Sequence, residues 1–458
     1  MNCSHKSRVT GFQCTNVATI NDRCPLHSAN YVDQGTFRKY ALSVYNKGIL
    51  DYSGIKFINV NFIDNVFGKH GNIIFTGCTF KDCLFNQVEL VNPDFSQSKL
   101  FETEFHNLTI SGSKATFLAA KFQNQNNNPF RAVTFKNLDK LDFSLVEWES
   151  SWVPLSSCFI ISNEINFTGL VSSAKEIGLS IINDPKGMIT YARDAFVAFN
   201  AGNICLDSIS HRGKLLIRQA IYDYSRFQLD LQNVDFDGMI SARLVNVGLS
   251  QCSLARSNIE KLDFINANWP VSDGRKIIYD QLNTSNAYAS RRELNRLYIQ
   301  LKKNYEDKRD YDSASDWHFR EMETRHKYLK EEKKELFTRA ALCIYKLASS
   351  YGENFVRPLG YLFLVWILFS ILFLYTGFHP GGADNISNIS YNLSIDGFIP
   401  SGDIAEALIY SISNIFFINS DAFASSSIWT KGFSILQKIL MVLFSSLFFL
   451  ALRRRFKR

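Results

Sequence analysis

The 458-residue sequence contains few residues that interrupt regular secondary structure or form covalent cross-links. It contains 9 Pro and 24 Gly, too few for a collagen-like or low-complexity chain. Its 9 Cys are unevenly spread, unlike those of small secreted scaffolds held by disulfide bonds. Charged residues make up 20% and apolar residues 46%, which excludes a disordered chain. At roughly 100–200 residues per domain, we expect two to four domains.

Signatures of catalysis are also missing. We find no GxxxxGK[ST] loop, no GxGxxG after a strand, no HExxH and no GxSxG motif, so we expect that the protein is not an enzyme. The formal net charge of +7 is modest, and it does not by itself indicate a nucleic-acid-binding protein. The first residues are polar and include Cys and His, so no targeting peptide is expected.

Phenylalanine, by contrast, is abundant, with 39 Phe against 6 Trp and 19 Tyr. Large apolar residues recur every five positions in three runs. These runs are Phe57, Phe62 and Phe67; Phe75, Phe80, Phe85, Leu90, Phe95, Leu100 and Phe105; and Leu244, Leu249, Leu254, Ile259, Phe264 and Trp269. The residue two positions before each is mostly small or apolar. In an extended chain both would point inward, and the remaining polar residues would face water and form corners.

This five-residue period resembles the pentapeptide-repeat family, whose members form a right-handed quadrilateral β-helix. The resemblance implies stacked coils over 50–270, about 4.8 Å apart, that pair as parallel strands. We expect irregular coils over 110–228, where the large residues lose phase and "RGKLLIRQAIYDY" has a helix-like pattern. Some family members mimic DNA with an acidic surface. Residues 51–270 hold 22 acidic and 19 basic residues, which favours a neutral scaffold or recognition rod.

Residues 1–30 contain the one candidate metal site that the sequence indicates. Cys3, Cys14, Cys24 and His27 follow the spacing C-x10-C-x9-C-x2-H. Three thiolates and an imidazole complete a tetrahedral, structural zinc site, and so short a segment cannot bury a core without a metal. The pattern resembles small bacterial and viral zinc-binding modules. His5 is a competing ligand, and the alternative is a flexible tail with unligated thiols.

Residues 285–340 are predicted to form a charged helical hairpin linker. From 290 to 339, 14 residues are basic and 11 acidic, with apolar residues at helical spacing. The pattern suggests two antiparallel helices, and the stretch resembles the connector of pentapeptide-repeat membrane proteins. It would serve as a solvated linker or as a coupling or oligomerisation surface.

Two apolar segments, 358–378 and 432–452, are long enough to cross a membrane as helices. A basic tail, 453–458, follows the second, and the segment between them holds five acidic residues and one Lys. The positive-inside rule then predicts a multi-pass protein of the bacterial inner membrane with both termini in the cytoplasm. The complete fold class is thus mixed: an interrupted cytoplasmic β-helix, a helical linker hairpin and two transmembrane helices.

A short apolar helix over 404–418 is expected to be re-entrant or interfacial. The order span, short helix, span is similar to two-helix potassium channels, but no TxGYG follows the short helix, so potassium selectivity of that type is not predicted. Our pore candidates are Lys438, Asn414 and Asn419. Because two spans cannot enclose a pore, conduction would require a homo-oligomer. The alternative is a plain membrane anchor.

Two functions follow from this organisation. The first is an effector of membrane permeability, in which the cytoplasmic repeat domain acts as a sensor and gates an oligomeric pore. Analogy with two-span proteins that carry large sensing domains suggests a toxic effector of antiphage defence, acting by abortive infection. The second is a membrane-anchored scaffold that binds a partner and conducts nothing. Both would contact the lipid bilayer, and a protein regulator would bind the β-helix or the hairpin.

Overall fold

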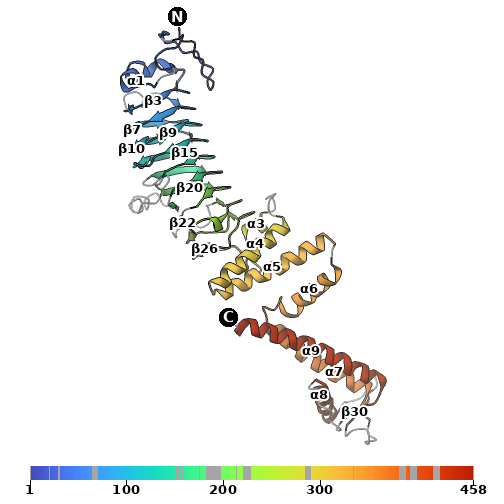
Figure 1. Ribbon diagram of the computed structural model, residues 1–458. Helices are drawn as coiled ribbons and strands as arrows, with labels where there is room; N and C mark the ends of the chain where they lie inside the picture. Colours follow the sequence, from blue (N-terminus) through green and yellow to red (C-terminus); the bar gives the residue numbers. More distant parts are fainter. Residues whose placement is uncertain are drawn as a thin grey trace. The chain divides into compact units, whose positions relative to one another are not determined.

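The computed structural model describes most of the chain, which divides into two compact units, Met1–Lys308 and Arg309–Arg458 (Figure 1). We describe each unit by itself. The described residues are 2–19, 21–28, 31–63, 71–150, 155, 158–174, 176–181, 197–212, 214–219, 228–283, 290–333, 335–380, 388–391, 400–415 and 423–456.

The first unit contains a β-solenoid of about 7 turns, which Figure 1 shows as stacked layers. One side is a seven-stranded parallel sheet. It consists of β3 (Lys56–Ile58), β6 (Thr79–Lys81), β9 (Lys99–Phe101), β13 (Lys121–Gln123), β16 (Glu147–Trp148), β18 (Val171–Ser172) and β21 (Ser210–His211). A second side consists of β4 (Asn61–Phe62), β7 (Leu84–Asn86), β10 (Glu104–His106) and β14 (Phe130–Arg131).

A third side is the longest sheet. Its path runs through β8 (Glu89–Val91), β11 (Thr109–Ser111), β15 (Thr134–Asp142), β17 (Phe159–Asn166), β20 (Val197–Cys205), β19 (Glu176–Ile181), β22 (Lys214–Gln219), β24 (Ser241–Val245) and β26 (Leu262–Ile265), and it is joined by β12 (Lys114–Thr116), β23 (Gln228–Asp230) and β25 (Cys252–Ser253). Smaller sheets pair β1 (Tyr45–Asn46), β2 (Ile49–Asp51) and β5 (Asn72–Ile74), and β27 (Val271–Ser272) with β28 (Arg275–Lys276).

The five-residue period places the large apolar residues in ladders at the core. Phe85 pairs in register with Phe105, twenty residues later, as Leu90 pairs with Ile110. The rings of Phe85 and Phe105 stack with centroids 4.8 Å apart and planes 8° from parallel. This distance equals the usual spacing of hydrogen-bonded strands, so each ring lies directly over the ring of the next coil. The predicted pentapeptide-repeat-like stack is confirmed.

The corners of the coils are left-handed backbone positions, also at intervals of five. Residues with positive φ in the regular coils are Asp82, Gln87, Asn92, Gln97, Glu102 and Asn107. Each follows a large inward residue by two positions. Asn and Asp tolerate this conformation better than most residues because their short polar side chains bond locally. The predicted polar corners are therefore present, and they turn the chain within a single residue.

The irregular region continues the stack with longer coils. Phe117 lies over Phe95 with rings 5.0 Å apart, and Phe143 lies over Phe117 at 4.6 Å, although the intervals are 22 and 26 residues instead of 20. Insertions thus shift the phase without breaking the ladder. The helix-like prediction for "RGKLLIRQAIYDY" was wrong for its described part, because Lys214–Gln219 forms β22, paired with β19 and β24.

Helices cover both ends of the solenoid. At the amino-terminal end, α1 (Gln34–Tyr40), followed by the 3₁₀ turn Ala41–Val44, places Phe37 against the first rings, 4.8 Å from Phe62. At the other end, after the short α3 (Tyr279–Leu282), α4 (Arg291–Asp307) caps the last coil. Its Asn304 donates to the backbone carbonyls of Glu260 and Leu262. The first half of the expected linker is therefore part of the solenoid unit.

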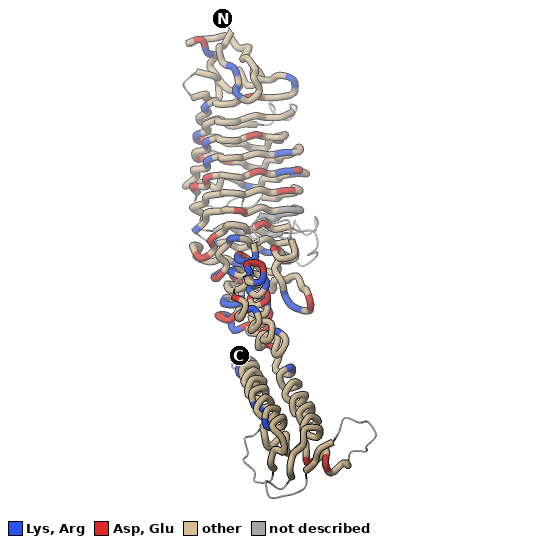
Figure 2. The backbone as a smooth tube through the Cα atoms, turned by 90° about the vertical axis from the view of Figure 1, so that its right-hand side faces the viewer, with Lys and Arg blue, Asp and Glu red and all other residues tan. Residues whose placement is uncertain are grey.

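The second unit is helical. It contains α5 (Tyr311–Glu331), α6 (Leu336–Ser349), α7 (Val356–Thr376), α8 (Ser401–Ile415) and α9 (Ile428–Phe456), with the strands β29 (Phe378–Pro380) and β30 (Phe423–Ser425). By length and composition, α7 and α9 could each cross a membrane, and in α9 the suitable segment is Ile428–Arg453. Figure 2 shows few charged residues along these two helices.

The helices α7 and α9 pack antiparallel, since Tyr361 stacks on Phe444 whereas Phe369 lies near Phe433. Their shared core includes Phe373 and is small. Large apolar side chains remain exposed along both helices, and they include Val356, Phe363, Leu364, Ile367, Leu368, Ile371, Ile428, Trp429, Ile435, Leu436, Ile439, Val442, Leu443, Phe449 and Leu450. Exposed apolar patches of this kind mark sites of interaction with a protein or a membrane.

Candidate metal centre and polar helix cluster

The four predicted metal ligands lie together at the amino-terminal end of the first unit. The Sγ atoms of Cys3, Cys14 and Cys24 and a ring nitrogen of His27 all lie within 4.8 Å of one another. All four side chains are buried. Cys14 Sγ lies 3.7 Å from Cys24 Sγ, and Cys24 Sγ lies 3.2 Å from His27 Nδ1.

These distances fit a tetrahedral site. With metal–sulfur bonds of about 2.3 Å and metal–nitrogen bonds of about 2.0 Å, ligand atoms stand about 3.5–3.8 Å apart. The cluster could therefore hold a metal ion at its centre. With four protein ligands the shell is closed, so it leaves no open position for substrate or activated water, and such a site is structural.

Local structure explains how distant residues converge. Cys3 N donates to Asn16 O and Cys14 N donates to His5 O. These hydrogen bonds pair two antiparallel segments, one carrying Cys3 and the other carrying Cys14. Cys24 and His27 occupy one turn, closed by His27 N donating to Cys24 O. The C-x2-H spacing thus places a thiol and an imidazole on the same side of a turn.

A second layer of polar contacts holds the centre. Asn16 Nδ2 donates to Ser43 Oγ at 2.6 Å and lies 3.6 Å from Cys24 Sγ. The hydrogen bond between the Cys14 and Cys24 thiols lowers the pKa of Cys24 and raises that of Cys14, so one thiolate is stabilised by its neighbour. Sequence spacing predicted the four side chains of the cluster, which the structure brings together, but it carried no signal for Asn16.

Asp51, on the first coil, attaches this amino-terminal segment to the solenoid. Ser7 Oγ donates to its carboxylate at 2.6 Å, and Thr10 Oγ1 donates to the same oxygen. Burial would raise the pKa of Asp51, but hydrogen bonds from Ser53, Ser7 and Thr10 outweigh it and hold the pKa below its usual value. The carboxylate therefore stays charged at neutral pH and can accept all of these hydrogen bonds.

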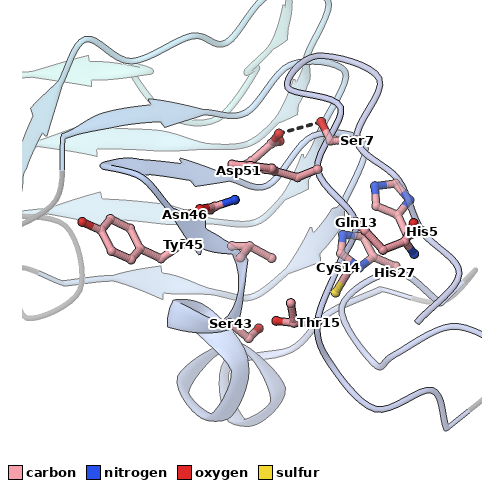
Figure 3. Close-up of a pocket in the computed structure, with 12 residues that line it drawn as sticks. His5, Ser7, Gln13, Cys14, Thr15, His27, Ser43, Tyr45, Asn46 and Asp51 are labelled. Atoms are coloured by element: carbon pink, nitrogen blue, oxygen red, sulfur yellow. Dashed lines mark hydrogen bonds between the residues drawn. The ribbon is translucent and has the colours of Figure 1, made fainter. Parts of the chain in front are cut away.

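His5, the competing ligand, lies outside the ligand cluster. Its ring stacks on the His27 ring, with centroids 3.8 Å apart, and it lines a cavity of about 260 Å³ between the metal segment and the first coil. Figure 3 shows His5, Ser7, Gln13 and Asp51 around this space. The cavity walls are mixed polar and apolar, and the structure gives His5 a packing role against His27.

The other cysteines of the solenoid lack the setting of a nucleophile. Cys78, Cys83 and Cys252 are buried at inward positions of the coils. Burial raises the pKa of each of these thiols, that of Cys83 to about 11. They remain protonated at neutral pH and act as small apolar residues.

The pore candidates lie in the second unit, where α8 packs against both α7 and α9. Asn414 Oδ1 accepts a hydrogen bond from Ser434 Oγ at 2.7 Å, so Asn414 does contact α9. Lys438 is half-buried on α9. Asn419, the third candidate, lies outside the described residues, as does the end of the predicted 404–418 helix.

Two residues that the sequence analysis did not select form the centre of this region. Gln437 and Ser411 are both fully buried. Gln437 Nε2 donates to Ser411 Oγ at 2.6 Å, and Ser411 Oγ donates to the backbone oxygen of Trp366 at 3.2 Å. Trp366 Nε1 in turn donates to Leu408 O at 3.3 Å. These contacts tie α7, α8 and α9 together, and we call Trp366, Leu408, Ser411 and Gln437 the polar cluster.

The polar cluster has unsatisfied hydrogen-bonding capacity. Gln437 Oε1 is buried and has no hydrogen-bond partner among the described residues. Buried polar groups normally have partners, so this acceptor is suited to a water molecule or a polar solute. The only sequence signal for Gln437 was its polarity within an apolar segment.

Comparisons with known proteins concern the fold alone. No protein-family model matches the chain, and no curated protein matches it. Among solved structures, the chain is similar to HetL, a pentapeptide repeat protein involved in heterocyst differentiation regulation from the cyanobacterium Nostoc sp. strain PCC 7120, at 13% identity and a TM-score of 0.28. The match covers 54% of this chain and 100% of that one. The pentapeptide-repeat-like β-solenoid therefore rests on the register and ring stacking described above.

Proposed function

We propose that this protein is an effector of membrane permeability in the bacterial inner membrane. In this proposal α7 and α9 span the bilayer, copies of the chain assemble around a pore, and the cytoplasmic solenoid gates it on binding a signal or protein regulator. Collapse of the membrane potential would be toxic, which suits abortive infection in antiphage defence. We further propose that the solenoid is a right-handed quadrilateral β-helix and that the metal is a structural zinc ion.

The observation that carries this proposal is the polar cluster between apolar helices. Polar side chains within a membrane are costly and generally face a bundle interior or a watery cavity, where they serve ion or proton pathways. Gln437 and Ser411 are fully buried among helices that otherwise expose apolar side chains. A short helix held between two spans by such contacts is also the arrangement expected for a re-entrant pore element.

Conduction predicts a loss of membrane potential when the protein is overproduced or triggered, measured with a voltage-sensitive dye. Gln437→Leu removes both hydrogen bonds from Gln437 to Ser411, each contributing about 0.6–2 kcal/mol in a membrane, so α8 should lose its position and depolarisation should fall several-fold. Lys438→Leu should also reduce conduction, because it removes a charge from the span, while membrane insertion persists.

Ile439→Leu, at an exposed apolar position of α9, is the matched control and should behave like the natural protein. If the natural protein leaves the potential intact under its trigger, the permeability proposal is wrong. If depolarisation occurs but Lys438→Leu does not change it, the pore survives and Lys438 has no part in it.

A second function, a membrane-anchored scaffold, is favoured by one specific observation. Two polar pairs between α8 and α9, Gln437 with Ser411 and Ser434 with Asn414, are hydrogen-bonded to each other. A pair of spans closed in this way can simply anchor the solenoid. Unchanged membrane potential, together with a protein partner bound to the solenoid, would establish this alternative.

Membrane topology gives a further prediction common to both functions. Reporter fusions after Arg458 and near Ser290 should show cytoplasmic activity, and a fusion near Asn388 should show periplasmic activity. Replacing the basic residues of 453–458 should scramble this orientation, because cytoplasmic Lys and Arg determine it. A periplasmic carboxyl terminus would contradict the two-span arrangement.

A further inference from the structure

The helix α6, which precedes the first proposed span, exposes large apolar side chains. Phe337 is 91% exposed, Leu336 70%, Leu347 61% and Ile344 53%. Cys343, between them in sequence, is exposed as well. This helix lies outside both candidate spans, so its exposed apolar residues are not explained by the crossing of the membrane.

These residues form one face. At about 100° per residue in an α-helix, Leu336, Phe337, Cys343, Ile344 and Leu347 fall within an arc that also contains Ala340 and no charged residue. In the described part of the chain, no side chain covers them. The face is therefore a continuous apolar stripe about three turns long, which we call the α6 stripe.

The opposite face of α6 packs against its own unit. Lys346 Nζ pairs with Glu323 Oε1 of α5 at 3.0 Å, and the Tyr345 ring lies 5.9 Å from the buried Tyr351 ring. These contacts fix the rotation of α6 about its axis. The α6 stripe therefore points away from α5 and cannot be hidden by a simple turn of the helix.

Position and charge indicate what covers the α6 stripe. Only residues 350–355 separate α6 from α7, and α6 contacts both α7 and α9, so α6 lies next to both proposed spans. Arg339 lies beside the stripe, and Arg357 is the second residue of α7. An amphipathic helix with basic residues beside an apolar face is suited to the interface of an anionic membrane.

We propose that α6 is an interfacial helix that binds the cytoplasmic surface of a bilayer containing anionic lipids, with the α6 stripe among the lipid chains near the headgroups. This inference rests on the proposed insertion of α7 and α9. It adds a lipid contact made by a helix that does not cross the membrane, and it gives the cytoplasmic helices of this unit a fixed depth. The occupant is lipid rather than a second copy of the chain, because α6 is joined to the first proposed span by only six residues and basic side chains lie beside its apolar face.

Cys343 provides a natural reporter for the test. The full chain is reconstituted in vesicles of phosphatidylethanolamine and phosphatidylglycerol and treated with a charged maleimide, and alkylation at each cysteine is measured by peptide mass spectrometry. Arg325→Cys, at an exposed position of α5, supplies a reference thiol in the same unit. We expect Cys343 to react at least tenfold more slowly than this reference, since lipid excludes the charged reagent.

Two variants sharpen the result. Phe337→Asp combined with Ile344→Asp should release α6 from the lipid and bring the Cys343 rate to within about threefold of the reference. Ile240→Asp, at a position 75% exposed on the solenoid, is the matched control and should leave Cys343 protected. Vesicles of phosphatidylcholine alone should give partial loss of protection, because the attraction of the basic residues is removed.

Three outcomes would overturn the inference, and they are distinguishable. If the protein resists a carbonate wash but Cys343 reacts as fast as the reference, the spans insert and α6 does not bind lipid. If Cys343 is protected and mild oxidation links two chains through it, a second copy covers the stripe. If the wash removes the protein from the vesicles, the spans do not insert, and the proposed function fails together with this inference.

Discussion

Replacing Cys14 by Ser is expected to release the metal ion and to unfold the amino-terminal segment while the solenoid stays folded. The natural protein should carry about one zinc ion per chain, since its four ligand atoms lie within 4.8 Å of one another. Structural zinc contributes about 10–16 kcal/mol in small zinc-dependent peptides. The buried apolar side chains of residues 2–28 are few, so they cannot replace that contribution. Metal content is measured by mass spectrometry, and unfolding by limited proteolysis between residues 2 and 28.

Cys343→Ser is the matched control, because Cys343 is exposed on α6 and far from the cluster in sequence. It should leave metal content and protease resistance unchanged. The solenoid should resist proteolysis in both variants, since its core consists of its own stacked rings. A protein that carries no metal and still has an ordered, protease-resistant amino terminus would show that the four side chains pack as thiols and imidazole alone.

The regular part of the solenoid could be predicted because its signal is local. One large inward residue and one polar corner every five positions suffice to define a coil, and Phe85, Gln87 and Phe105 occupy those places. The irregular part could not, because insertions change the interval between ladder positions from 20 to 22 and 26 residues. A fixed five-residue period therefore does not predict the inward positions of Phe117 and Phe143, although both rings stack on the rings of neighbouring coils.

The misassigned strand has a physical reason of its own. In β22, Leu215 and Ile217 are buried and alternate with less buried neighbours, which is the period of a strand. The charged and apolar residues around them also fit helical spacing over a short window. The pairing of β22 with β19 and β24 favours the strand over the helix. These partners lie tens of residues away in the sequence, so a short sequence window does not reveal the pairing.

For the candidate metal site, the spacing in the sequence predicted the four clustered side chains, but it did not predict the residues that hold them in place. Cys24 and His27 are three residues apart, and this spacing alone places both side chains on the same side of one turn. Asp51 is 44 residues from Ser7, and nothing in its sequence surroundings marks it as an acceptor for the metal segment. In the second unit, charge drew attention to Lys438, whereas the uncharged Gln437 beside it is the residue that is fully buried and bonded to α8.

Truncation of Phe80 to Ala is expected to lower the free energy of unfolding of the solenoid by about 3–5 kcal/mol, the usual cost of removing a buried aromatic ring. Phe80 is fully buried. Its ring stacks on Phe57, with centroids 5.2 Å apart, and its strand pairs in register with Leu100 of the next coil. Side chains in adjacent coils on both sides hold the space open, so a cavity would remain.

Phe264→Ala is the informative comparison, because Phe264 belongs to the last coil. It is 8% exposed, and its ring lies 5.0 Å from Trp269 and 6.2 Å from Tyr305 of α4. In the described part of the chain, α4 rather than a further coil covers it, so neighbours can move into the space. The loss of unfolding free energy should therefore be about 3 kcal/mol or less. Hydrogen exchange of the β6 and β26 amides in the full chain measures both losses. In a stack of coils each layer depends on its neighbours, so Phe80→Ala should also speed exchange in β3 and β9, whereas Phe264→Ala should leave them unchanged. Equal losses of unfolding free energy in Phe80→Ala and Phe264→Ala would contradict a solenoid stabilised by stacking between coils. Faster exchange confined to β6 in Phe80→Ala would contradict it as well.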